Sequence, residues 1–346
     1  MFEDTDRRNF LAGGAGLICT LAGHRILAGD RGVDVDALAA QVPVPPKVAA
    51  ASSRSLPLPG QQPTGSGGQR REYWIQAERV HWNIVPSRID QMMDKRIPGH
   101  WKFTAWAYRQ YTPNFAAPMG PATIPGPLLQ GQTNDQIVVN FRNKLKTPVT
   151  MHPHGIFYAE AMDGSYKGKF TDPGGFVRPG ATTQYVWDCK PGTEGAWPYH
   201  DHGPMDPMGI FKGLFGAIII RKPEDKVPDL EVPLFLHDFI PPATGLNANI
   251  SCINGRAYTG NTPTIQAKVG QDVALHVFGV DNNFHTFHVH GHRWTNEAGK
   301  VVDNATLGPG DSLTVRFTED NPGRWLYHCH VFTHLHMGMS GWYVVS

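Results

Sequence analysis

Apolar residues in this chain fall in short runs, alternating or continuous, that are separated by Gly, Pro, Asn and Asp. Runs of this kind between turn residues predict β-strands. No segment shows helical spacing of apolar positions over more than two or three turns, so we predict an all-β protein. The strands are expected at 73–82, 103–111, 136–141, 183–187 and 214–220, and then at 232–237, 264–269, 273–280, 286–289, 312–317, 325–329 and 341–345.

An internal repeat indicates two domains. The segment 131–143 reads GQTNDQIVVNFRN and precedes a His-x-His-Gly, and the segment 270–279 reads GQDVALHVFG and precedes another. Each half then ends with a second His-x-His, so one unit is used twice. The strand spacing fits Greek-key β-sandwiches. We predict one sandwich over 72–225 and a second over 226–346, with 221–231 as the connection.

The first 71 residues differ in composition from the remainder. The segment 6–11 reads DRRNFL and resembles a twin-arginine export motif, and the apolar stretch that follows is too short and too glycine-rich to span a bilayer. We predict an export signal over 1–28 and a disordered linker over 29–71, whose Pro, Gly and Ser cannot build a core. The expected location is periplasmic or extracellular, without a membrane span. A chance arginine pair on a tail is the alternative.

Charge and cysteine content narrow the class further. The 346 residues carry a net charge of +1, which does not favour nucleic acid or an anionic membrane as partner. Of the four cysteines, Cys19 falls in the predicted signal and Cys329 stands between two histidines. Cys189 and Cys252 either form a disulfide in an oxidising compartment or remain thiols, and the sequence leaves both open.

Histidines are the unusual feature, because most of the 17 occur in tight clusters. On a strand, residues i and i+2 point to the same face about 7 Å apart, so one His-x-His can present two imidazoles to neighbouring metal ions. A lone zinc site takes about four ligands, so eight paired imidazoles predict a cluster of several ions. The four pairs are His152/His154, His200/His202, His288/His290 and His328/His330.

Cys329 gives the last pair a second role. Because it lies between two ligands on a strand, its side chain faces the opposite side of that strand. With His334, Met339 and one more histidine it can form a His₂Cys site with a weak axial Met, which is the pattern of type 1 copper. His285 is the natural second imidazole. Zinc is the alternative, but it does not call for Met339.

The motifs together resemble those of multicopper oxidases, and most closely the two-domain small laccases, over residues 72–346. They are HPHG at 152–155, WPYHDH at 197–202, HTFHVHGHRW at 285–294 and WLYHCH at 325–330. The resemblance implies two cupredoxin domains and four coppers per chain. It also implies one-electron oxidation of a small phenolic or aromatic substrate, coupled to reduction of dioxygen to water. A homotrimer would place each trinuclear cluster between domain 1 of one chain and domain 2 of the next.

The same resemblance assigns roles to residues. Asp163 and Asp303 match proton-relay carboxylates, Tyr158 matches a tyrosine that supplies an electron, and Trp325 matches a tryptophan near the coppers. A turn explains Asp163 equally well, and ordinary core packing explains Tyr158 and Trp325. The implied ligands are His285, Cys329, His334 and Met339 for type 1 copper, His152 and His288 for type 2, and His154, His200, His202, His290, His328 and His330 for the type 3 pair.

Three other functions compete with this interpretation. A metallo-oxidase of Cu(I), Fe(II) or Mn(II) needs an acidic or Met-rich entry site near His285 and His334, where no such run occurs. A copper nitrite reductase needs its type 1 cysteine in the first domain, where Asp201 stands instead. A copper-storage protein does not require Cys329 between two cluster ligands. No metal is assigned to the remaining histidines, His292 among them.

Overall fold

The computed structural model describes residues 68–169, 174–204 and 207–346. The predicted export signal lies outside these residues, as does the predicted linker up to residue 67. Strand β1 (Arg70–Asn83) begins two residues before the expected start of ordered structure at Glu72. No helix in the described part of the chain is long and apolar enough to cross a membrane.

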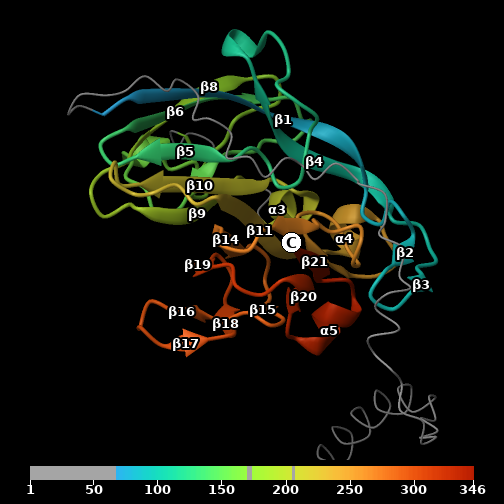
Figure 1. Ribbon diagram of the computed structural model, residues 1–346. Helices are drawn as coiled ribbons and strands as arrows, with labels where there is room; N and C mark the ends of the chain where they lie inside the picture. Colours follow the sequence, from blue (N-terminus) through green and yellow to red (C-terminus); the bar gives the residue numbers. More distant parts are fainter. Residues whose placement is uncertain (1–67, 170–173, 205–206) are drawn as a thin grey trace, which may run out of the picture. The chain divides into compact units, whose positions relative to one another are not determined.

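Two four-stranded sheets form the first sandwich (Figure 1). In each sheet one pair of strands is parallel, β1 with β6 and β5 with β10, and the other neighbouring pairs are antiparallel. One sheet has the order β4 (Lys102–Tyr111), β1, β6 (Gln136–Asn143) and β8 (Thr182–Asp188), and the other has the order β5 (Leu129–Gln132), β10 (Phe215–Arg221), β9 (Gly195–His200) and β7 (His152–Pro153).

The second sandwich repeats this strand order, with one further strand at the end of its second sheet. Strands β11 and β14 are parallel, as are β13 and β21, so the pairing directions repeat as well. The all-β, two-sandwich prediction is therefore confirmed. The orders are β12 (Ile250–Ile253), β11 (Leu230–Phe239), β14 (Asp272–Gly279) and β19 (Ser312–Thr318), and β13 (Ile265–Ala267), β21 (Ser340–Val345), β20 (Gly323–Cys329), β15 (His285–Val289) and β18 (Asn304–Leu307).

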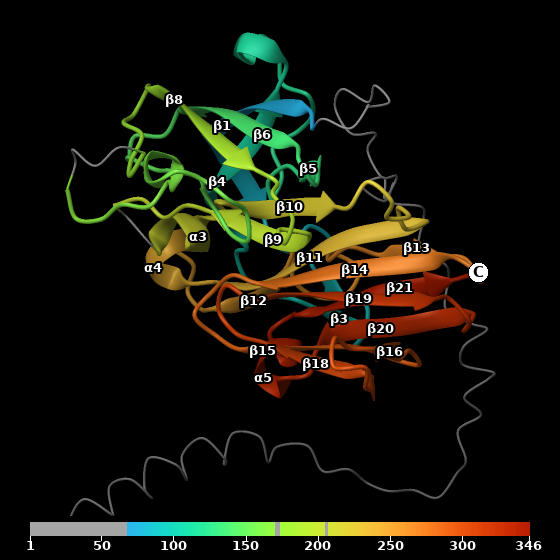
Figure 2. The same ribbon diagram turned by 90° about the vertical axis from the view of Figure 1, so that its left-hand side faces the viewer.

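The other described elements are short. Figures 1 and 2 both show α5 beside β15 at one end of the second sandwich. None of the described helices exceeds five residues, as the absence of long helical patterns predicted. These elements are the ribbons β2 (Ile89–Asp90) with β3 (Lys95–Arg96) and β16 (Trp294–Thr295) with β17 (Val301–Val302), the 3₁₀ turns η1 (Pro113–Phe115) and η2 (Glu160–Met162), and the helices α3 (Met208–Lys212), α4 (Pro241–Thr244) and α5 (Phe332–His336).

All seven residues of strand β10 are buried, because the strand lies between two apolar cores. Ile218 faces the core of the first sandwich, whereas Phe215 faces a second apolar core that both sandwiches share. In that shared core the rings of Phe215 and Phe235 lie 5.1 Å apart, and those of Phe235 and Phe278 lie 4.4 Å apart. A strand that is apolar on both faces is thus explained by cores on both sides.

The two cysteines that the sequence left open are both free thiols. Cys189 packs in the core of the first sandwich, and Cys252 packs in the core shared by the two sandwiches. A disulfide needs the two sulfur atoms in bonding contact, so the possible Cys189–Cys252 bond is not formed.

Candidate copper centres

The four His-x-His pairs lie at strand ends, two in each sandwich. The antiparallel pairing of β7 with β9 places His152 opposite His200. The antiparallel pairing of β15 with β20 places His288 opposite His328. Each pair's ring centroids lie 5.2–5.7 Å apart. Neighbouring strands therefore bring two pairs together in each sandwich, as the same-face argument predicted.

In the first sandwich the imidazole nitrogens converge. The Nε2 atoms of His154 and His200 are 2.9 Å apart. His200 Nδ1 contacts the carbonyl of Asp201 at 2.9 Å, and His152 Nδ1 contacts the carbonyl of Asp163 at 2.7 Å. A carbonyl only accepts, so both Nδ1 atoms carry the proton and both Nε2 atoms keep a lone pair. The lone pairs of His152 and His200, together with the nearby His154 ring, fit a metal ion.

The second sandwich has the same arrangement. His290 Nε2 and His328 Nε2 are 3.1 Å apart, and His328 Nδ1 contacts the carbonyl of Cys329 at 2.8 Å. His288 Nδ1 contacts the carbonyl of Asp303 at 2.6 Å. In each sandwich three of these histidines have donor atoms within 4.8 Å of one another.

Burial keeps these imidazoles neutral. Burial, together with the neighbouring imidazoles, lowers the pKa of His200 to about 3 and that of His154 to about 4. The pKa of His328 falls to about 4 for the same reasons. A histidine binds metal only as the neutral ring, so these groups are ready ligands at neutral pH.

A third group surrounds Cys329. Its Sγ lies 3.9 Å from His285 Nδ1 and 3.6 Å from His334 Nδ1. Nitrogen and sulfur ligands of one metal ion lie about 3.5 Å apart when each bond is about 2.0–2.3 Å. The three donors therefore fit a single ion. Met339 is fully buried, and its N–H donates to the His334 carbonyl at 3.0 Å, which ties it to the same site.

The sulfur of Cys329 is set up as a thiolate. Burial alone would raise its pKa, but hydrogen bonds from His285 and His334 lower the pKa to about 6. The backbone N–H of Thr286 also donates to Sγ, at 3.4 Å. A thiolate with two imidazoles and a methionine is the donor set of type 1 copper.

The two histidines predicted to bind type 1 copper have different surroundings. The side chain of His285 is fully buried, and its Nε2 contacts Asp281 Oδ1 at 3.0 Å. His334 is partly exposed on α5. The exposed aromatic residues Phe284 and Phe332 are neighbours of these histidines in the chain. Each of these two histidines thus has an exposed aromatic residue within two positions of it in the chain.

Two predicted support residues lie beside His152. The Asp163 carboxylate is 3.2 Å from His152 Nδ1 and 3.1 Å from Lys167 Nζ. The Tyr158 ring is 6.1 Å from the His152 ring, and burial followed by the Asp163 carboxylate raises the Tyr158 pKa. Asp303, the second predicted proton-relay carboxylate, is exposed. Its contact with His288 is made by the backbone carbonyl. Proton or electron transfer by these groups stays a prediction.

Trp325 has a counterpart in the first sandwich. Its indole N–H donates to the carbonyl four residues earlier at 3.0 Å, and that of Trp197 does the same at 2.8 Å. Both rings pack where a side chain on the glycine of His-x-His-Gly would stand, at Gly291 and Gly155. Trp197 belongs to the sandwich without a type 1 cysteine, so the shared environment favours packing as the role of both.

Beside the predicted ligands, sequence reasoning missed two buried acid–histidine pairs. His292 Nε2 contacts Glu319 at 2.9 Å, and its Nδ1 contacts the His290 carbonyl at 2.7 Å. The other pair is Asp281 with His285. The position of His292 next to a ligand motif was a usable signal. Nothing in the turn sequence around Asp281 marks it.

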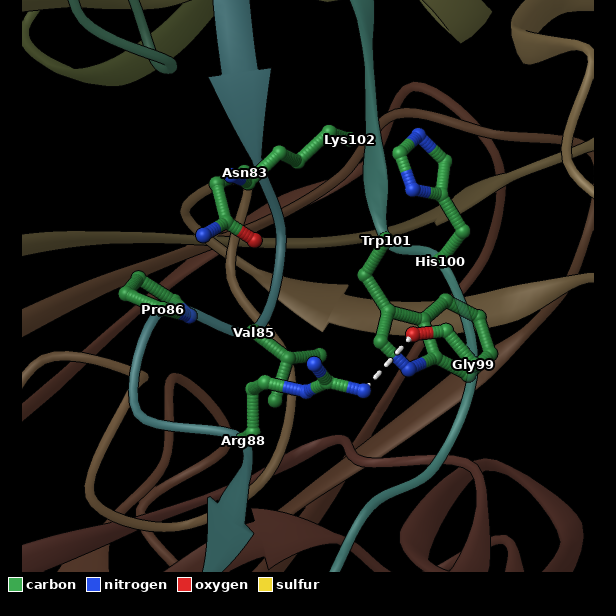
Figure 3. Close-up of a pocket in the computed structure, with 8 residues that line it drawn as sticks. All are labelled: Asn83, Val85, Pro86, Arg88, Gly99, His100, Trp101 and Lys102. Atoms are coloured by element: carbon green, nitrogen blue, oxygen red, sulfur yellow. Dashed lines mark hydrogen bonds between the residues drawn. The ribbon is translucent and has the colours of Figure 1, made fainter.

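The pocket in Figure 3 is separate from these groups, because it shares no residue with them. Within it, the Arg88 guanidinium donates to the Gly99 carbonyl at 3.3 Å (Figure 3). Its lining is Asn83, Val85, Pro86, Arg88, Gly99, His100, Trp101 and Lys102.

Comparison with known proteins agrees with the fold and the donor sets. Residues 119–225 and 228–346 each match a family model described as multicopper oxidase. The chain belongs to the multicopper oxidase family, in a two-domain form. Copper is the cofactor that this family implies.

The curated relatives are longer proteins. A probable nitrite reductase–hydroxylamine oxidoreductase fusion protein of Kuenenia stuttgartiensis is 32% identical over 239 residues, which cover 65% of this chain and 28% of the relative. Human hephaestin is 28% identical over 352 residues, covering 82% of this chain and 30% of hephaestin. The chain therefore spans about 30% of the length of these relatives.

Solved structures show the same fold. A multicopper oxidase has a TM-score of 0.65 at 23% identity, covering 80% of this chain and 89% of its own. A blue copper oxidase from Nitrosomonas europaea has a TM-score of 0.63 at 22% identity, covering 80% and 86%. A copper nitrite reductase from the same organism has a TM-score of 0.60 at 16% identity, covering 80% and 93%.

Proposed function

We propose that this chain is a laccase-like oxidase, which couples one-electron oxidation of phenolic or aromatic donors to four-electron reduction of dioxygen to water. The supporting observation is Cys329, whose sulfur joins the type 1 donor set while its bonded neighbours His328 and His330 belong to the four-histidine group. Bound copper would supply the one-electron chemistry. Cys329 itself provides a covalent connection of a few bonds between the two kinds of site.

The proposed inventory is four coppers per chain. His285, Cys329, His334 and Met339 would hold type 1 copper, and the eight paired histidines would hold a trinuclear cluster. Asp163 and Asp303 are proposed to relay the protons that water formation consumes, and Tyr158 to supply an electron. His152 and His288 are proposed for type 2 copper, and His154, His200, His202, His290, His328 and His330 for the type 3 pair.

We propose a homotrimer in which the cluster forms between chains. Each described metal-ligand group takes its histidines from one sandwich, and no group in residues 68–169, 174–204 and 207–346 combines both. For eight imidazoles to meet, the histidine group of the first sandwich in one chain would face the histidine group of the second sandwich in another. Ring closure around a threefold axis lets each chain offer both halves.

Mixing two inactive variants tests this assembly. One variant carries His154→Ala and His200→Ala, and the other carries His290→Ala and His328→Ala. After joint refolding, some interfaces pair an intact first sandwich with an intact second sandwich, so part of the activity should return. Each variant refolded alone is the control. Mixed samples that elute as trimers yet stay inactive would contradict an interchain cluster.

The donor is proposed to be aromatic because exposed aromatic residues neighbour the proposed type 1 ligands in the chain. Phe284 and Phe332 are 58% and 65% exposed, whereas Asp281 and Asp238 are each 4% exposed. A hydrated metal ion favours exposed oxygen ligands, and these carboxylates are not presented to solvent. The second candidate is a ferroxidase, which the similarity to hephaestin favours.

Steady-state kinetics separate these two donors. We expect higher kcat/KM for phenols than for Fe(II), Mn(II) or Cu(I), and we expect Phe332→Ala to raise KM for phenols alone. A higher kcat/KM for Fe(II) would favour the ferroxidase. Nitrite reduction, which the Kuenenia relative brings into question, is tested by anaerobic nitrite consumption, and we expect none because Asp201 replaces the first-domain cysteine.

The destination of the protein is proposed to be periplasmic or extracellular, by twin-arginine export. The DRRNFL segment at 6–11 supports this proposal. Fractionation of expressing cells with Arg7→Lys and Arg8→Lys as control tests it, and equal export of the variant would contradict it.

A further inference from the structure

We propose that Asp281 is a positioning residue of the type 1 site, one that fixes the tautomer of His285 and lowers the reduction potential of the bound copper. The inference rests on the proposed function, since it needs a type 1 copper at Cys329. It concerns a residue that belongs to no histidine motif.

The geometry gives Asp281 a single partner among the ligands. Its Oδ1 lies 3.0 Å from His285 Nε2, and both side chains have no exposed surface. An ionised carboxylate only accepts hydrogen bonds, so Nε2 carries the proton. Nδ1, the atom that lies 3.9 Å from Cys329 Sγ, is then the ring nitrogen of His285 that is left to bind copper.

The carboxylate is itself held in place. Asp281 follows β14 by two residues, and the backbone N–H of Asn283 donates to the same Oδ1 at 2.8 Å. Its other oxygen, Oδ2, has no hydrogen-bond partner in the described part of the chain. Among the described residues, Asp281 forms an ion pair with His285 and with no lysine or arginine. The charge is therefore directed at the copper ligand.

A fixed negative charge at this position affects the two copper oxidation states unequally. Cu(II) carries one more positive charge than Cu(I), and buried charges interact more strongly than exposed ones. The Asp281 carboxylate thus stabilises Cu(II) more than Cu(I). Partners of a ligating histidine also make the ring a stronger donor, which acts in the same direction.

His334 lacks such a partner. Its Nδ1 contacts Cys329 Sγ at 3.6 Å, and no carboxylate pairs with its ring among the residues described. The first sandwich has Val149 at the position equivalent to His285, three residues before its His-x-His-Gly. The carboxylate–histidine contact therefore accompanies the one site that has a cysteine.

Asp238 supplies a matched control. It is as buried as Asp281, and it lies close by, since its Oδ2 accepts from the Asn283 amide at 3.0 Å. It makes no hydrogen bond to His285. An Asp238→Asn variant removes a carboxyl from the same region without touching the ligand.

The experiment compares the full-length wild type with Asp281→Asn and Asp238→Asn. Copper content, the blue absorption and the type 1 potential from a redox titration are measured for each. The asparagine oxygen still accepts from His285, so Asp281→Asn should keep the blue copper. Its Cu(I)/Cu(II) ratio at a fixed applied potential should rise by about tenfold or more, and Asp238→Asn should change that ratio less.

A second readout does not depend on copper. In the metal-free protein, ¹⁵N shifts should report a proton on Nε2 of His285 in the wild type, and Asp281→Leu should lose that preference for a protonated Nε2. An unchanged potential in Asp281→Asn, or an equal shift in Asp238→Asn, would overturn the inference. A wild type without any blue copper would instead contradict the proposed function.

Discussion

Cys329 and Asp201 stand at equivalent positions of the two sandwiches and make the same backbone contact. The carbonyl of each lies 2.8–2.9 Å from Nδ1 of the histidine before it. Their side chains also take the same donor, because Thr286 N–H donates to Cys329 Sγ at 3.4 Å and Thr150 N–H donates to Asp201 Oδ1 at 2.8 Å. The first sandwich thus keeps the surroundings of a type 1 cysteine and has a carboxylate in its place.

Restoring a cysteine there should not restore a type 1 site. We expect Asp201→Cys to add no blue absorption, because Val149 occupies the position of His285 and provides no ligand. Copper analysis with absorption spectroscopy checks this. A second blue copper per chain would show that the first sandwich has other ligands available.

Removing the existing cysteine should separate the two kinds of site. Cys329→Ser should abolish the blue colour and substrate oxidation, and the copper content should fall by one per chain, because His328 and His330 remain. Copper content and absorption on the same sample measure both effects. Blue colour that persists in this variant would refute the type 1 assignment.

The glycine of the first His-x-His-Gly should be intolerant of a side chain. Gly155 has φ +64°, and a Cβ there would lie 1.9 Å from Trp197 Cδ2. Strain at positive φ costs about 1 kcal/mol and overpacking about 1–3 kcal/mol more. Gly155→Ala should therefore lower the free energy of unfolding more than Gly180→Ala, where φ is +79° and nothing lies within 4 Å. Equal losses in chemical denaturation would contradict the packing account of Trp197.

Acid should destabilise the metal-free protein through its buried histidines. Burial, followed by neighbouring imidazoles, lowers the pKa of His200 to about 3, whereas the unfolded chain titrates near 6.5. Between about pH 6 and pH 4 the unfolded state binds a proton that the folded state does not, so stability falls as pH falls.

Each such histidine contributes at most about 1.4 kcal/mol per pH unit in this range. His200→Gln should therefore show a shallower loss of stability between about pH 6 and pH 4 than the wild type, by up to that amount. His81→Gln, at an exposed position, should keep the wild-type slope. The same dependence of the free energy of unfolding on pH in the wild type and both variants would show that His200 is not buried as a neutral ring.

The alternation of apolar positions was sufficient to predict most of the fold. All twelve predicted segments overlap observed strands, and the repeat was recognisable from GQTNDQIVVNFRN and GQDVALHVFG. Strand β9 was missed because Pro198 lies inside it, and proline argues against a strand. Strand β5 was expected only as a strand that follows the turn at 124–127, and its bounds could not be predicted.

The site was predictable where spacing alone carries the chemistry. His-x-His on a strand, and a cysteine between two histidines, fix their relations locally. The contacts of His292 with Glu319 bridge 27 positions, and such partners depend on how loops from different strands meet. Asp281 lies only four residues from His285, yet an Asp-Asn-Asn turn is so common in loops that its burial could not be foreseen.

The central claim is that electrons collected one at a time at Cys329 reduce dioxygen fully to water. The most direct test measures oxygen uptake, donor oxidation and peroxide together during turnover of a phenolic donor. We predict four one-electron donors oxidised for each dioxygen consumed, without peroxide, and loss of uptake in Cys329→Ser. Two donors per dioxygen with accumulation of peroxide, or no oxygen uptake by copper-loaded protein, would contradict the account.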